Sequence, residues 1–170
     1  MFASKRERPD IQVCVTFLCT RVKSPTEEDY EKFGYVITFL KNTIYLPLII
    51  GADDSGSMTW NIDASFAVHL DSKSHTGASL TLEHGSALSL SCKQKINIKS
   101  LTEAELVSVD NTMTSVMFTK HFFESQVKQM NECSKLKPLG SDTIIEQDNA
   151  SAIQLEQNGW KSSSRRSKTY

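Results

Sequence analysis

The chain has 170 residues, of which 39% are hydrophobic and 23% are charged, and its net charge is −1. This composition predicts one ordinary globular domain, with room for a small appendage. A pI near 6.4 excludes the overall basic character of many nucleic-acid-binding proteins, so nucleic-acid binding would have to use local patches. The scattered cysteines exclude a secreted disulfide framework, and the longest apolar run, 44–50, is too short to cross a bilayer. We therefore expect an intracellular protein with no membrane partner.

Residues 1–50 form a predicted helical segment. Pro9 marks one helix start, and Thr26 is an N-cap for a second helix whose first turn is acidic. The second helix carries an apolar stripe at helical spacing, which consists of Tyr30, Phe33, Ile37 and Leu40. The turn-forming cluster at 51–57 is the best candidate for a boundary with the part that follows.

Residues 58–160 form a second predicted unit, which begins with strands. Apolar and polar residues alternate over 60–66, and this pattern predicts a strand with Asp63 on its polar face. Two further strands, 78–82 and 87–92, are separated by a short turn. The three strands should therefore pair antiparallel in one sheet.

The rest of this unit alternates helix and strand. A long helix with a broad apolar face is predicted over about 102–125, and 143–145 is a short strand of buried type. A last helix is predicted over 150–157, and 161–170 is a basic, serine-rich tail. The order strand, strand, strand, helix, strand, helix predicts an α/β fold with a mixed sheet.

Three acidic residues stand where these predicted elements could bring them together. Asp63 lies in the first strand, Glu105 near the start of the long helix, and Asp148 at the end of the last strand. Aspartate is disfavoured inside strands, so Asp63 favours a functional reading. Clustered carboxylates repel unless a cation compensates them, and two Mg²⁺ ions about 3.5 to 4 Å apart assist phosphodiester hydrolysis. The pattern is typical of a two-metal phosphodiester hydrolase.

Two of these acids also have a purely structural interpretation. Thr102 and Glu105 have the spacing of a capping box, and so do Ser100 and Glu103, so either glutamate could serve only to fix the helix start. Glu103 is therefore a rival ligand. Asp148 could equally be an N-cap of the last helix.

Local positive charge could hold the phosphates of a nucleic acid. The candidate residues are Lys93, Lys95, Lys99, Arg165 and Arg166. The alternative is an ordinary solvated basic surface. His75 lies near the predicted acidic site, but loop histidines are mostly polar surface, so we do not count it as catalytic.

Six stretches in order along the chain carry a resemblance to a known family. They are 17–29, 61–69, 74–77, 94–97, 102–106 and 147–152. With these stretches the chain resembles the ribonuclease H region of a copia-type retrotransposon Pol polyprotein, preceded by the end of its reverse transcriptase. The resemblance implies a ribonuclease H-like fold for 58–160 and a reverse transcriptase origin for 1–50.

The resemblance also implies a site and a substrate. Asp63, Glu105 and Asp148 match three acids of the family's metal site, which would bind two Mg²⁺ or Mn²⁺ ions and hydrolyse the RNA strand of an RNA/DNA hybrid. A fourth acid would lie beyond Tyr170, so we expect a truncated domain. The expected partners are the hybrid and the remainder of the polyprotein, and the expected location is cytoplasmic, in a virus-like particle, or nuclear.

Two functional hypotheses follow from the sequence. The first is a metal-dependent ribonuclease H that acts on RNA/DNA hybrids during reverse transcription. The second is a catalytically inactive retroelement remnant, which retains the fold and weak nucleic-acid binding. Cleavage of a hybrid substrate distinguishes them.

Overall fold

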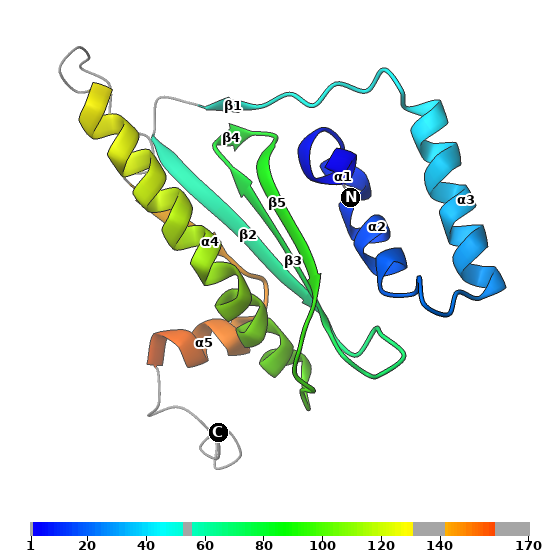
Figure 1. The fold of residues 1–170 in the computed structure, drawn as a ribbon. Helices are drawn as coiled ribbons and strands as arrows, with labels where there is room; N and C mark the ends of the chain where they lie inside the picture. Colours follow the sequence, from blue (N-terminus) through cyan, green and yellow to red (C-terminus); the bar gives the residue numbers. More distant parts are fainter. Residues whose placement is uncertain (1, 53–55, 131–141, 159–170) are drawn as a thin grey trace.

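A computed structural model describes residues 2–52, 56–130 and 142–158, and Figure 1 shows its mixed α/β architecture. The N-terminal elements are α1 (Phe2–Arg6), η1 (Pro9–Ile11), α2 (Gln12–Cys19) and α3 (Glu27–Asn42). The strands that follow are β1 (Gly51–Ala52), β2 (Ser57–Ser65), β3 (His75–Thr81), β4 (Glu83–His84) and β5 (Ser86–Lys93). The last elements are α4 (Leu101–Met130), β6 (Asp142–Glu146) and α5 (Ala150–Asn158). The predicted tail, 161–170, lies outside the described residues.

The main sheet is mixed, with the strand order β5-β3-β2-β6. β2, β3 and β5 pair antiparallel as predicted, whereas β6 pairs parallel with β2 after the long crossover through α4. β1 and β4 pair with each other in a separate two-stranded sheet, which the sequence did not predict. In Figure 1, α4 runs along one side of the sheet and the N-terminal helices lie at the other side.

The alternation predicted for the first strand is confirmed in β2. Met58, Trp60 and Ile62 are buried and pack with Val109 and Val116 of α4. Because successive strand residues point to opposite faces, Asp63 lies on the face that α4 does not cover. The burial of the large apolar residues against α4 therefore fixes which face carries the acid.

The prediction of a buried last strand is wrong. β6 is at the edge of the sheet, and Ile144 and Ile145 are 44% and 37% exposed. An edge strand has a neighbour on one side only, so apolar residues in it need not be enclosed. A short apolar run in a sequence does not distinguish an edge strand from a central one.

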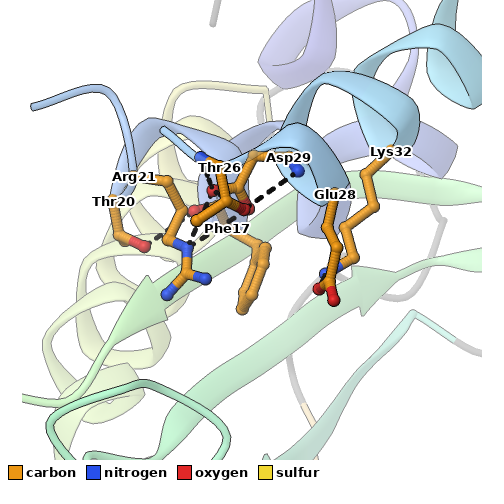
Figure 2. Close-up of polar contacts among 7 residues, drawn as sticks. All are labelled: Phe17, Thr20, Arg21, Thr26, Glu28, Asp29 and Lys32. Carbon is orange, nitrogen blue, oxygen red and sulfur yellow. Dashed lines mark hydrogen bonds and ion pairs between the residues drawn. The ribbon is translucent and has the colours of Figure 1, made fainter. Parts of the chain in front are cut away.

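The turn between α2 and α3 is fixed by a polar cluster, shown in Figure 2. Thr26 and Asp29 form a reciprocal capping box at the start of α3, so the predicted N-cap is confirmed. Arg21 pairs with Asp29 at 3.2 Å, and its guanidinium lies over the ring of Phe17. The hydrogen bond from the Thr26 backbone, followed by that from its hydroxyl and the contact with Arg21, lowers the pKa of Asp29 against the opposing effect of burial.

The apolar stripe predicted for α3 is not buried. Tyr30, Phe33 and Ile37 are exposed, and Val36 is the buried apolar residue of this helix. The reason is that α3 packs mainly against α2, so most of its circumference faces away from other described elements. Helical spacing predicted the helix correctly but did not show which face would be covered.

A buried histidine pair connects the N-terminal helices to the sheet. Nε2 of His69 lies 3.0 Å from Nδ1 of His75, and Nε2 of His75 lies 2.7 Å from Oγ of Ser91. The ring of His69 also stacks on Phe17 of α2. The expectation that His75 is polar loop surface is wrong, because it begins β3 and is only 6% exposed.

Both histidines resist protonation in the folded chain. Burial lowers the pKa of His69, and the positive charges of Lys93 and Arg21 add to this effect, while Asp71 opposes it. Burial also lowers the pKa of His75, as does the neighbouring ring of His69. Both rings are therefore best accommodated in the neutral form.

We predict that this pair makes the folded state sensitive to mild acid. Below about pH 6.5 the histidines of the unfolded chain take up protons that the folded pair resists. The free energy of unfolding should therefore decrease as the pH is lowered. The fall is at most about 1.4 kcal/mol per pH unit for each proton. Urea unfolding between about pH 7.5 and 5 should show a smaller fall for His69→Gln/His75→Gln. An equal fall in the double variant would contradict the prediction, and exposed His121→Gln is the matched control.

Candidate metal centre

Asp63 is positioned by the central strand β2. Its side chain lies on the face opposite α4, is solvent-exposed, and accepts a hydrogen bond of 2.8 Å from the backbone N–H of Ala64. On one side Asp63 is directly opposite Gly77 of β3. On the other side, β6 pairs with β2 up to Asn61 and Glu146, which leaves the next residues of both strands free to converge.

Glu105 reaches the site from the start of α4. Ser100 accepts a hydrogen bond from the backbone N–H of Glu103, and the carboxylate of Glu103 accepts one from the backbone of Lys99. These two residues therefore cap the helix, although the carboxylate of Glu103 bonds the backbone of Lys99 and not, as the predicted capping box would require, that of Ser100. Glu105 is left for another role, is 2% exposed, and accepts a hydrogen bond of 3.2 Å from Nε2 of Gln147.

Asp148 lies two residues beyond the end of β6. Because β6 runs parallel to β2 and their pairing ends at Asn61 and Glu146, two further residues in each segment bring Asp63 and Asp148 to the same level. The N-cap of α5 is the next residue, since Oδ1 of Asn149 accepts a hydrogen bond from the backbone N–H of Ala152 at 3.0 Å. The structure therefore gives the capping contact to Asn149 and leaves the carboxylate of Asp148 exposed.

The three acids predicted from the sequence are brought together. Carboxylate oxygens of Asp63, Glu105 and Asp148 all lie within 4.8 Å of one another. In the described parts of the chain they are the only such group of histidine, cysteine or acidic side chains, and no lysine or arginine there pairs with them. Three hard oxygen donors without a protein counterion fit a divalent cation such as Mg²⁺.

The electrostatics of the cluster centre on Glu105. Burial raises the pKa of Glu105 most, and the negative charges of Asp63 and Asp148 raise it further. The hydrogen bond from Gln147 and a contact with the backbone of Ala64 oppose this rise, because they favour the ionised form. Gln147 was not singled out in the sequence; its position beside Asp148 at the end of a strand was the available signal.

An open groove of about 780 Å³ leads away from the acids over the face of the sheet opposite α4. Asp63 and Asp148 lie at one end, and Pro9 and Gln12 from the N-terminal elements lie along it. Gln12 connects the two parts, because its Nε2 donates a hydrogen bond of 3.1 Å to the carbonyl of Ser89. The carboxylates can therefore be reached by an extended ligand that lies on the sheet.

The predicted nucleic-acid-binding residues are only partly described. Lys93 ends β5 and forms an ion pair of 2.8 Å with Asp71, so part of its charge is compensated. Lys95 and Lys99 are exposed in the segment before α4. Arg165 and Arg166 lie outside the described residues.

Comparison with known proteins gives one informative similarity. The chain is 27% identical over 159 residues to the retrovirus-related Pol polyprotein from transposon TNT 1-94 of Nicotiana tabacum. The alignment covers 93% of this chain and 11% of the length of that polyprotein. This similarity supports a retroelement origin. No protein-family profile and no solved structure matches the chain. Within the described ranges, no helix is long and apolar enough to cross a membrane.

We predict that Mg²⁺ or Mn²⁺ stabilises the folded chain through these carboxylates. Without metal, Asp63→Asn should be at least as stable as the unmodified chain, because it relieves repulsion. With free metal tenfold above its Kd, the unmodified chain should gain about 1.4 kcal/mol and the variant should gain less. Thermal unfolding with and without metal measures both effects. Asp110→Asn, which changes an exposed acid elsewhere on α4, is the control and should gain as much as the unmodified chain.

Gln147 should matter for metal affinity even though it offers no carboxylate. Gln147→Leu removes the donor that holds one oxygen of Glu105, and we expect a metal affinity that is roughly 10- to 100-fold weaker. Metal titration followed by thermal unfolding measures this without reference to activity. Gln154→Leu, an exposed change on α5, should leave the affinity unaltered. Equal affinities for both variants would show that the contact with Glu105 is incidental.

Proposed function

We propose that residues 58–160 form a ribonuclease H-like domain that hydrolyses the RNA strand of RNA/DNA hybrids with Mg²⁺ or Mn²⁺. The observation that carries this proposal is the convergence of Asp63, Glu105 and Asp148 within 4.8 Å at one end of a mixed sheet. The similarity to a retroelement Pol polyprotein supports the retroelement origin that this proposal assumes. The helical segment 1–50 would then derive from the end of a reverse transcriptase, and the rest of a Pol polyprotein would be its partner.

The three acids would have different parts in metal binding, because two are exposed and one is buried. The exposed carboxylates of Asp63 and Asp148 face the groove, where they can hold cations at the edge nearest the substrate. Buried Glu105 is held by Gln147, so its oxygen has a fixed direction before any ion arrives. Two bound ions would activate water and stabilise the leaving oxygen of the phosphodiester.

Selection of RNA would depend on the sugar and not on the base. The 2′-hydroxyl distinguishes RNA from DNA, and small polar side chains in the groove, such as Asn61 and Ser79, can form hydrogen bonds with it. The groove offers these groups along the surface of the sheet. We therefore propose cleavage with little sequence preference.

Cleavage of a labelled RNA/DNA hybrid tests this function. We expect metal-dependent cutting of the RNA strand only, reduced roughly 100-fold or more in Asp63→Asn because a metal ligand is lost. Asp110→Asn should cut like the unmodified chain, and a DNA duplex of the same sequence should stay intact. If the folded, unmodified chain binds metal but cuts no hybrid, the proposal is wrong and the inactive remnant is the better description.

A further inference from the structure

Gly77 lines the groove at the end where the acids lie. It is directly opposite Asp63 of β2 on one side and Ser91 of β5 on the other. Paired residues of neighbouring strands point to the same face of a sheet, so a side chain at position 77 would project into the groove beside the metal ligands. Glycine weakens a strand interior by roughly 0.5 to 1 kcal/mol relative to alanine, so its presence calls for a reason.

The fold itself supplies no reason. Gly77 does not have a positive φ, and a Cβ atom added there would meet no other atom within 4 Å. Gly85 shows the contrast, because its φ is +67° and an added Cβ would collide with the carbonyl oxygen of Ile49. Glycine is thus required by the turn at position 85 but not by the strand at position 77.

The surroundings of Gly77 suit a sugar-phosphate backbone. Asn61, Ser79 and Ser89 are paired in register across three strands and form a row of small polar side chains beside it. These groups can donate hydrogen bonds to phosphate and sugar oxygens. Asp10, at the groove wall, is compensated by Arg8 through hydrogen bonds of 2.8 to 3.2 Å, so its charge opposes a phosphate less.

We propose that Gly77 is a substrate-positioning residue, over which the sugar-phosphate backbone of the RNA strand lies in direct contact with the sheet. The missing side chain lets the strand approach closely enough for its scissile phosphate to reach the cations held by Asp63, Glu105 and Asp148. Glycine in a strand is a known solution where another backbone must approach closely. This inference rests on the proposed function, because it assumes a hybrid substrate.

Gly77→Val tests the inference because it should fill the groove without harming the fold. Valine is favoured in strands, and the structure leaves room for its Cβ. We expect at least a roughly tenfold loss of affinity for a fluorescent RNA/DNA hybrid, measured by anisotropy in Ca²⁺, and a comparable or larger loss of cleavage in Mg²⁺. Gly77→Ala should have a smaller effect in the same direction. Metal-induced stabilisation in thermal unfolding should be unchanged in both variants.

Gly34→Val is the matched control, because Gly34 of α3 is exposed and also has no atom within 4 Å of an added Cβ. It should bind and cut like the unmodified chain. If the unmodified chain binds and cuts the hybrid and Gly77→Val does the same, this inference alone is wrong. If the unmodified chain binds the hybrid without cutting it and Gly77→Val loses binding, the groove assignment stands and only the hydrolytic function fails. If the unmodified chain does not bind the hybrid, both proposals fail.

Discussion

The parallel pairing of β6 with β2 is the constraint on which the candidate site depends. Asp148 comes 85 residues after Asp63 by sequence number, and the two meet because α4 carries the chain back along the sheet before β6 begins. The helix that makes this crossover also supplies Glu105 from its second turn. One connection therefore buries the core on one face of β2 and assembles the three carboxylates at the end of the same strand. Loss of the β6 pairing would separate Asp148 from the other two acids without disturbing the antiparallel strands.

Neighbouring polar residues leave the three acids free to act together. Ser100 and Glu103 satisfy the start of α4, and Asn149 satisfies the start of α5, so neither Glu105 nor Asp148 is consumed in capping a helix. The carboxylates are then close, poorly compensated and partly buried, which is unfavourable in the absence of a cation. Without a bound cation, the fold would be more stable if one of the three acids were a neutral residue. This cost favours a functional explanation for the cluster.

Sequence patterns predicted the parts of this structure that depend on local periodicity. The alternation around Asp63 and the helical spacing in α4 were sufficient for the order of strands and helices along the chain, and the places of the three acids in those elements indicated that they could meet. Periodicity could not show which of Glu103 and Glu105 caps the helix, because both fit the same motif. Nor could it show that the stripe of α3 is uncovered or that His75 is buried, since both depend on contacts between distant segments. The role of Gln147 also required three-dimensional proximity to Glu105.

The two faces of β2 make the site and the core interdependent. A slip of one residue in the register of β2 would turn Trp60 toward the groove and Asp63 toward Val109 and Val116 of α4. Burying an uncompensated carboxylate and exposing an indole are both costly, so core packing strongly selects the register that presents Asp63 to the groove. Gly77 shares that register through its pairing with Asp63, and its open position is fixed by the same packing. Under the proposed function, the approach of a nucleic-acid strand to the metal site would thus be set by the apolar residues on the opposite face of β2.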